Sequence, residues 1–237
     1  MGESRIYIVH CDGLCEPVNP GGIATYGWTV GRGGREIQTG CGLAAEGPNA
    51  TNNVAEYTAV LQALAWLVPR LHPGDAVRLY TDSQLVVLQI QGVYRVRSRR
   101  LQPLYRQVQL WLTRARDRGA SVTVAWVPRE ENQRADELSR IAWATIMARR
   151  RPELASRYTV RYDAGNQYFL VQGVQKDSHP GFRVRFSPLQ CTCKHFRRSG
   201  RPCNHIQAVI RHQLDADPSL SEADVCRNLS KGMSLRP

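Results

Sequence analysis

The sequence lacks the features that direct a chain to or across a membrane. No apolar run approaches the about 20 residues that a membrane-spanning helix needs. The first residues, MGESRIYIVH, contain no basic stretch followed by an apolar one, and Ile6 stands where a myristoylation signal has Ser or Thr. We therefore expect a cytoplasmic protein. Internal repeats and low-complexity runs are also absent, and 237 residues can form one or two domains.

A complete set of intramolecular disulfides is excluded, because the sequence has seven cysteines, an odd number. Four of the cysteines are scattered singly. The other three, Cys191, Cys193 and Cys203, stand at the spacing of metal ligands rather than of disulfide partners. The cysteines therefore indicate a metal site in the second half of the chain.

Acidic residues are few in comparison with basic ones, and the formal net charge is +12. Residues 1–148 hold 16 Lys and Arg against 13 Asp and Glu, a difference of +3, whereas residues 149–237 hold 16 against 7, a difference of +9. Such an excess favours a polyanionic partner, because each neutralised phosphate releases counterions. A solvated basic face is the alternative, and charge alone does not decide between them.

The first part of the chain alternates strand and helix patterns. Strands are expected at residues 5–13, 25–32, 35–47, 76–82 and 121–128, and helices at 52–69, 83–92, 101–117 and 132–150. Three antiparallel strands followed by alternating helices and strands predict an α/β fold, a mixed five-stranded sheet flanked by helices. The arginine run 149–151 and Pro152 mark a linker, so we place the first domain at residues 1–150.

The pattern changes after Pro152 and predicts a smaller domain. A short antiparallel meander is expected at residues 157–163, 167–175 and 182–187, followed by helices at 205–214 and 219–230. In the third strand, apolar residues alternate with Arg183 and Arg185, so one face is apolar and the other is cationic.

Four carboxylates stand at positions that a sheet of this kind brings together. Asp12 and Asp82 end predicted strands, and Glu56 and Asp136 lie in the first turns of predicted helices. Taken singly, each is explained by a turn, a helix cap or the helix dipole. Strand ends that face helix N-termini place such groups in one crevice, where divalent cations must neutralise them. Oxygen ligands suit Mg²⁺ or Mn²⁺, and two such ions support in-line phosphoryl displacement.

Four segments carry these carboxylates: IVHCDGLCEPVNPGGIATYGW, ATNNVAEYTAVLQAL, LYTDSQLVV and WVPREENQRADELSR. Over about residues 4–148 they closely resemble type 1 ribonuclease H in its compact archaeal and bacterial form. The resemblance implies hydrolysis of the RNA strand of RNA/DNA hybrids with two Mg²⁺ or Mn²⁺ ions, leaving 5′-phosphate and 3′-hydroxyl ends. It also implies that Asp12 bridges both ions, Asp136 joins it on the ion that activates water, and Glu56 and Asp82 hold the second ion.

The resemblance further implies contacts with the substrate. Asn19, Asn52, Asn53 and Gln84 match positions that read the minor groove of the hybrid, where the 2′-hydroxyl distinguishes RNA from DNA. Thr51 matches a contact with a phosphate of the DNA strand. For the two adjacent asparagines, capping of the following helix is an alternative role that is compatible with the first.

The sequence departs from the best-studied ribonucleases H in two places. The loop before the last helix, PREENQ, contains no histidine, and Arg129 is our candidate there for assisting product release. The long basic substrate-binding protrusion is also absent. Only GVYRVRSRR remains between Gln91 and Leu101, and its arginines bind phosphate or form a solvated loop.

The segment CTCKHFRRSGRPCNH supplies a second metal site with the pattern C-x-C-x9-C-x-H. Cys191, Cys193, Cys203 and His205 would fill a tetrahedral zinc site without an open position, so the metal would be structural. Packing of reduced cysteines as small apolar residues is the alternative, and His195 is a competing ligand outside the pattern. With RYTVRY and YFLVQG upstream, residues 156–214 resemble a SWIM-type zinc finger, which leaves 215–237 as a C-terminal helix and tail.

That second resemblance implies a module that binds DNA or protein, and the basic excess favours nucleic acid. The arginines within the finger point the same way: Arg197, Arg198 and Arg201. We expect the module to hold the enzyme on a hybrid or duplex in place of the missing protrusion. The alternatives are a hybrid-binding adaptor without catalysis, and a nuclease localised by a protein-binding finger. An exonuclease of the same superfold is less favoured, because Leu14 stands where that pattern has a second acid.

Overall fold

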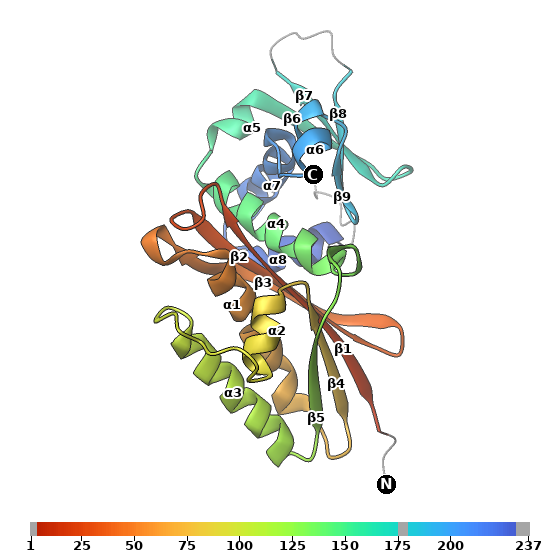
Figure 1. Ribbon diagram of the computed structural model, residues 1–237. Coiled ribbons are helices and arrows are strands. Elements are labelled where there is room, and N and C mark those ends of the chain that lie inside the picture. Colours follow the sequence, from red (N-terminus) through yellow and green to blue (C-terminus); the bar gives the residue numbers. More distant parts are fainter. Residues whose placement is uncertain (1–3, 175–179, 231–237) are drawn as a thin grey trace. The chain divides into compact units, whose positions relative to one another are not determined.

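The computed structural model describes residues 4–174 and 180–230 and divides into two compact units, residues 1–139 and 140–237 (Figure 1). Helix α4 (Gln133–Arg149) contributes its first residues to one unit and the remainder to the other. Within the described ranges, no helix is long and apolar enough to cross a membrane.

The first unit contains the mixed five-stranded sheet that the sequence predicts. Its strands are β1 (Ile6–Glu16), β2 (Ile23–Arg32), β3 (Arg35–Glu46), β4 (Ala76–Thr81) and β5 (Ser121–Trp126). They are arranged in the order β3-β2-β1-β4-β5, with β1–β2 and β2–β3 antiparallel and β1–β4 and β4–β5 parallel. The first three strands form the predicted meander, and the parallel pairs require the helical connections that follow.

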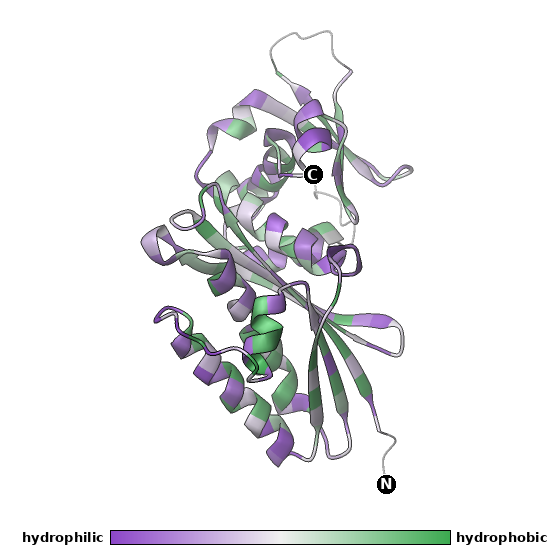
Figure 2. Cartoon of the chain, viewed as in Figure 1, coloured by the Kyte–Doolittle hydropathy of each residue, from purple (hydrophilic) through white to green (hydrophobic). Residues whose placement is uncertain are grey.

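Three helices of the first unit connect these strands: α1 (Asn52–Leu67), α2 (Gln84–Ile90) and α3 (Gln102–Asp117). Three short 3₁₀ turns accompany them: η1 (Gly47–Asn49), η2 (Val68–Arg70) and η3 (Arg129–Glu131). Helix α1 is apolar on most sides and is buried along most of its length. The neighbouring α2, whose sequence is QLVVLQI, is largely green in Figure 2. Helix α1 ends two residues earlier than expected, because Pro69 supplies no backbone N–H and the chain tightens into η2.

The hydrophobic core of the first unit lies between α1 and one face of the sheet. Tyr7, Val9 and Cys11 alternate along β1 and are buried in the same cluster as Tyr57 and Leu64 of α1. The alternate residues of β1, Ile8, His10 and Asp12, therefore face the opposite side of the sheet. This alternation decides which residues of β1 contribute to the core and which are available for a site.

A buried ion pair joins the start of β1 to the turn before β4. The Arg5 guanidinium and the Asp75 carboxylate are 2.6 Å apart, and Asp75 also accepts the backbone N–H of His72. The hydrogen bond from Arg5 is the main reason why the pKa of Asp75 falls to about 2. Because the folded pKa lies below the unfolded value, the stabilisation is present above pH 4 and is lost as the pH falls toward 2.

We predict that Asp75→Asn lowers the stability of the first unit near neutral pH by at most about 2.5 kcal/mol, and by much less at pH 2. The measurement is urea unfolding of both proteins at pH 6, 4 and 2. Asp117→Asn, an exposed acid at the end of α3, is the matched control. A stability difference that does not change between pH 6 and pH 2 would contradict this electrostatic explanation.

The second unit is a four-stranded antiparallel sheet with helices. It contains α5 (Glu153–Arg157), β6 (Tyr158–Asp163), β7 (Tyr168–Gly173), β8 (Phe182–Phe186), β9 (Leu189–Cys191), α6 (Lys194–Ser199), α7 (Asn204–Ala216) and α8 (Glu222–Ser230). The strand order is β6-β7-β8-β9, and α7 packs against one face of the sheet. The predicted meander is present, whereas β9, α5 and α6 were not expected, because elements of three to six residues are too short to show a period.

The last helix, α8, has a capping box at its start. Ser221 and Asp224 form a reciprocal pair, in which Ser221 N–H donates to the carboxylate at 3.0 Å and Asp224 N–H donates to Ser221 Oγ at 3.2 Å. This arrangement satisfies a backbone donor at the start of α8.

Candidate functional site

The four predicted metal-binding carboxylates lie close together in the first unit. Asp12 comes from β1, Asp82 directly follows β4, Glu56 lies in the second turn of α1 and Asp136 lies in the first turn of α4. Asp12 is 7% exposed. Burial raises the pKa of Asp12 well above its usual value, and the charges of Asp82, Asp136 and Glu56 raise it further. These groups are therefore near enough to repel one another.

The position of Asp12 differs from the prediction that it ends the first strand. β1 continues to Glu16, and Asp12 is paired with Gly27 on β2. The Asp-Gly sequence does not form a turn here, because the residues that follow it pair with β2 as far as Ile23. Asp12 is thus held by pairing with β2 on one side, while on the other side the pairing of β1 with β4 ends one residue earlier, at Cys11.

Two glycines allow helices to approach Asp12 closely. A Cβ atom at Gly13 would lie 2.2 Å from the backbone nitrogen of Glu56, and one at Gly27 would lie 2.5 Å from the carbonyl oxygen of Ala135. Both contacts are with backbone and cannot be relieved by a side-chain rotation. The absence of side chains at Gly13 and Gly27 therefore brings α1 and α4, with Glu56 and Asp136, next to Asp12.

Each carboxylate of the cluster has a hydrogen-bond donor from the chain. Ser139 Oγ donates to Asp12 at 3.1 Å, Ser83 Oγ to Glu56 at 2.6 Å, and Asn132 Nδ2 to Asp82 at 2.9 Å. The fourth donor is Arg129, whose guanidinium lies 2.7 Å from Asp136 and is 63% exposed. Burial also raises the pKa of Glu56, and the hydrogen bond from Ser83 offsets part of this rise.

The positioning role of these polar neighbours was not predicted from the sequence. Ser83 caps α2 by accepting a hydrogen bond from Val86 N–H, and it also donates to Glu56. Asn132 and Ser139 lie inside the segment WVPREENQRADELSR, where their spacing from Asp136 was the only available signal.

Four carboxylates, of which Asp12 is buried and three are partly buried, form a donor set suited to hard divalent cations. In the ionised form the four groups of the cluster repel one another, and bound Mg²⁺ or Mn²⁺ would relieve this repulsion. A carboxylate has about four lone-pair sites, so acceptance of a hydrogen bond is compatible with coordination of a cation. The residues present in the first unit therefore fit the metal ions that the sequence implies.

Asn132 links three segments of the site. It is 1% exposed, and its Nδ2 donates both to the carbonyl oxygen of Cys11 and to Asp82. It lies immediately before α4, so it connects the helix that carries Asp136 to β1 and to the residue after β4. Burial lowers the pKa of His10, two residues before Asp12, and a hydrogen bond with Asn132 opposes this change.

We predict that Asn132→Ala lowers kcat for cleavage of an RNA/DNA hybrid by about 10- to 100-fold, the usual effect of removing a group that orients a metal ligand. KM changes less, because Asn132 is buried beneath the carboxylates. The measurement is steady-state cleavage over a range of Mg²⁺ concentrations, with Gln133→Ala, which changes an exposed neighbour, as the control. An unchanged kcat would show that Asn132 does not position Asp82.

The predicted substrate-binding residues are divided between two places. Asn19, Thr51 and Asn53 line a cavity of about 330 Å³ together with Ser98 and Arg100. Arg100 comes from the short segment that stands where other ribonucleases H have the protrusion. The cavity is therefore a polar site that contains one of the arginines whose role was open.

The remaining members of this set have other surroundings. Asn52 donates its backbone N–H to Asn19 at 3.3 Å, and Gln84 begins α2 outside the residues that line the cavity. The cap of α1 is Thr51, which accepts a hydrogen bond from Val54 N–H at 3.1 Å, rather than either asparagine.

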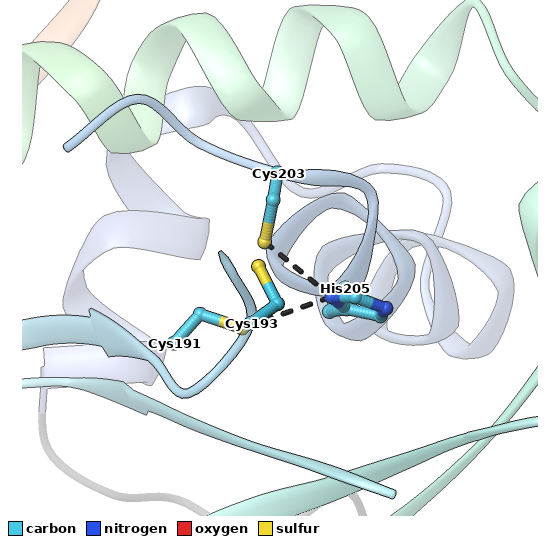
Figure 3. Close-up of side chains that lie close together, drawn as sticks. All are labelled: Cys191, Cys193, Cys203 and His205. Carbon is cyan, nitrogen blue, oxygen red and sulfur yellow. Dashed lines mark hydrogen bonds between the residues drawn. The ribbon is translucent and has the colours of Figure 1, made fainter. Parts of the chain in front are cut away.

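The predicted zinc ligands form a compact group in the second unit (Figure 3). The ligand atoms of Cys191, Cys193, Cys203 and His205 all lie within 4.8 Å of one another, and the three cysteines are buried. His205 Nδ1 lies 3.7 Å from both Cys191 Sγ and Cys203 Sγ. His195 is exposed and outside this group. Three thiols and one imidazole at this separation fit a tetrahedral zinc ion.

Separate elements deliver these ligands. Cys191 ends β9, Cys193 caps α6, Cys203 caps α7 and His205 lies in the first turn of α7. The His205 ring is stacked on Phe182 of β8, with 4.0 Å between ring centroids. A metal ion at this point would join the edge of the sheet to both helices.

The strand order and the carboxylate cluster of the first unit define a ribonuclease H-like domain. A family model described as reverse transcriptase-like matches residues 16–142, and a model described as SWIM zinc finger matches residues 158–214. The chain therefore belongs to the reverse transcriptase-like family of ribonuclease H folds and carries a SWIM zinc finger after that domain.

Two solved structures are similar to the first unit. The N-terminal RNase H domain of Rv2228c from Mycobacterium tuberculosis, solved as a fusion with maltose binding protein, is 30% identical, with a TM-score of 0.51 over 59% of this chain and 94% of that one. LC11-RNase H1, isolated from compost by a metagenomic approach, is 28% identical, with a TM-score of 0.51 over 60% of this chain and 97% of that one.

Among curated proteins, the bifunctional protein Rv2228c of Mycobacterium tuberculosis is 39% identical over 90 residues, which is 38% of this chain. The match spans only 23% of the length of that relative. An uncharacterized protein of Mycobacterium bovis matches to the same extent.

Proposed function

We propose that the protein is a ribonuclease H that hydrolyses the RNA strand of RNA/DNA hybrids with two Mg²⁺ or Mn²⁺ ions and leaves 5′-phosphate and 3′-hydroxyl ends. The observation that supports this most directly is the mutual proximity of Asp12, Glu56, Asp82 and Asp136 in a domain of the ribonuclease H fold. A protein that only binds hybrids would not need four carboxylates near one another, because they repel a phosphate backbone unless cations are bound.

The residues of the first unit have distinct roles in this proposal. Asp12 and Asp136 would hold one ion, and Asp12, Glu56 and Asp82 the other. When bound, the ions supply Lewis-acid stabilisation and an activated water. Ser139, Ser83 and Asn132 fix the orientation of the carboxylates through the hydrogen bonds described above.

Substrate contacts follow from the cavity at the start of α1. Thr51 and Arg100 line it with polar groups suited to a phosphate of the DNA strand. We place the minor-groove contacts on Asn19, Asn52, Asn53 and Gln84. Arg129 pairs with Asp136 and is largely exposed, so it can exchange that carboxylate for a departing phosphate. This is the role in product release that we assign to it.

The direct test is cleavage of a hybrid whose RNA strand is labelled at its 5′ end, in the presence of Mg²⁺. Single-stranded RNA and duplex DNA of the same sequence serve as controls. Mapping of the products distinguishes internal from terminal cleavage and identifies the new ends. Lack of cleavage of the hybrid with either Mg²⁺ or Mn²⁺ would refute the proposal.

We further propose that the second unit binds one structural zinc ion and holds the enzyme on nucleic acid within the cytoplasm. The net charge of residues 149–237 and the arginines of α6 support nucleic acid over protein as the partner. Localisation of the nuclease by a protein partner is the alternative, and it predicts no change in affinity for bare hybrid when the second unit is removed.

Deletion of residues 152–237 is expected to raise KM for a hybrid about 10-fold and to flatten its dependence on salt, because phosphate contacts are lost. kcat should change little, since the carboxylate cluster lies in the first unit. The measurement is steady-state cleavage between 50 and about 200 mM salt, with circular dichroism to verify folding of the truncated chain. An unchanged KM would contradict the proposed tether.

A further inference from the structure

The sheet of the second unit has one face covered by α7 and one face open. Residues that are paired across neighbouring strands project from the same face. One face therefore carries three cross-strand pairs: Arg161 with Leu170, Leu170 with Arg183, and Arg185 with Gln190. All three arginines are exposed. The alternate residues of these strands are mostly buried toward α7. We call the first set, with Tyr168, the outer face.

Among the residues that the structure describes, the carboxylates of the second unit do not neutralise the arginines of the outer face. Those carboxylates pair elsewhere, for example Asp215 with Arg211 and Asp224 with Arg227. Within the described ranges, Arg161 and Arg183 make no ion pair, and Arg185 donates to the backbone carbonyl of Asn166 at 3.0 Å.

One acid, Asp163, lies at the edge of this face. Its carboxylate accepts two hydrogen bonds from Asn166, both at 3.0 Å, and these hydrogen bonds lower its pKa. Asp163 is therefore committed to the turn between β6 and β7, and the outer face keeps a net positive charge.

Apolar and aromatic groups lie between these cations. Leu170 is flanked by Arg161 on one side and Arg183 on the other. The Arg183 guanidinium lies 5.8 Å from the ring centroid of Tyr168, which is half-buried. The outer face thus alternates planar or apolar surfaces with positive charge.

This combination distinguishes between forms of nucleic acid. Unstacked bases bind to aromatic rings and guanidinium planes while neighbouring arginines hold the phosphates. A duplex keeps its bases stacked inside and gives Leu170 and Tyr168 no partner. Four strands at about 4.8 Å spacing also span about 14 Å, more than the about 12 Å width of a DNA major groove.

We propose that the outer face binds single-stranded nucleic acid, with Arg161, Arg183 and Arg185 on phosphates and Tyr168 and Leu170 against bases. This deepens the nucleic-acid tether proposed above by naming its surface and the strand form that it takes. A nuclease that degrades one strand of a hybrid leaves a single strand beside its product, so such a surface would keep the enzyme near further substrate.

The test uses the full-length protein and a fluorescent 12-nucleotide single-stranded DNA, which contains no RNA strand to cleave. The triple variant Arg161→Gln/Arg183→Gln/Arg185→Gln should bind it at least about 10-fold more weakly, and the slope of log affinity against log salt should fall by about 2, from three phosphate contacts on a single strand. Tyr168→Ala alone should weaken binding by about 5-fold or more, the effect of losing one stacked base.

The matched control is Arg114→Gln/Arg116→Gln/Arg118→Gln, which removes the same charge from the exposed end of α3 and its cap. Equal losses in the two triple variants would show a non-specific charge effect and overturn the proposal. The proposal would also be overturned if the wild type bound duplex DNA or hybrid as tightly as the single strand and the outer-face triple variant lost the same affinity for all of them. A third result would overturn it as well: the outer-face triple variant binds the single strand as tightly as the wild type does, and the wild type captures an acidic peptide.

Two readouts keep the outcomes interpretable. Zinc content and circular dichroism of each variant show that the second unit is folded. Cleavage of a short hybrid at saturating concentration should be unchanged in all variants, because none alters the carboxylate cluster. Failure of the nuclease assignment would appear as absent cleavage in the wild type, whereas failure of the outer-face assignment would appear only in the binding data.

Discussion

Asp82→Asn is expected to abolish cleavage of an RNA/DNA hybrid, with a loss in kcat on the order of 10³-fold or more. The amide has nearly the shape of the carboxylate and can still meet Asn132, but it carries no negative charge for a divalent cation. The loss should therefore come from weakened metal binding rather than from disturbance of the fold.

The same substitution is expected to stabilise the protein in the absence of metal. The charge of Asp82 raises the pKa of Asp12, which shows that the two carboxylates repel one another across the site. Removal of one charge relieves that repulsion, so the melting temperature of the metal-free variant should rise by a few degrees, equivalent to about 1 kcal/mol. Opposite changes in activity and stability are typical of a functional site that is maintained against its own electrostatic cost.

Three measurements test this pair of effects: hybrid cleavage, the melting temperature without divalent ions, and the increase in melting temperature on addition of Mg²⁺. Mg²⁺ should stabilise the wild type and have little effect on the variant, because ligand binding to the folded state is what raises stability. Asp117→Asn, which removes one exposed charge from the end of α3, should leave all three unchanged. Cleavage that survives in Asp82→Asn would refute the proposed role of the cluster.

The sequence was sufficient to predict the succession of strands and helices and the mixed five-stranded sheet of the first unit, because its segments are long and strongly patterned. β1 alternates buried and outward residues, and α1 is apolar over four turns. The position of Asp12 was predicted less well. Asp-Gly usually favours a turn, but pairing with β2 overrides that local preference and extends β1 to Glu16. A tertiary pairing partner cannot be recognised from the few residues around Asp12 alone.

The polar neighbours of the carboxylates show a second limit. Ser139 and Asn132 are far from Asp12 and Asp82 in sequence, so their hydrogen bonds depend on the approach of α4 to β1. That approach is possible because Gly27 has no side chain, a feature that sequence patterns do not distinguish from an ordinary strand glycine. The zinc ligands were easier to predict, since they fall within 15 residues and their chemistry alone requires that they meet.

Cys203→Ser is expected to unfold the second unit while leaving the first folded. Cys203 stands at the N-cap position of α7, and its sulfur lies 3.7 Å from His205 Nδ1 within the ligand group. The sheet is small, and α7 is the helix that packs against three of its four strands. Zinc binding supplies about 10–16 kcal/mol in isolated zinc-finger peptides, far more than such a core provides.

The expected result is loss of the bound zinc, loss of protease resistance in residues 152–237, and a KM for hybrid similar to that of the truncated chain. kcat should be retained, which separates this variant from Asp82→Asn. Zinc content, limited proteolysis and steady-state cleavage measure the three effects, and His195→Ala, an exposed residue outside the ligand group, is the control. If Cys203→Ser lost zinc but kept both protease resistance and the wild-type KM, the fold of the second unit would not depend on the metal. Its outer face would then have to be held by the contacts of α7 alone.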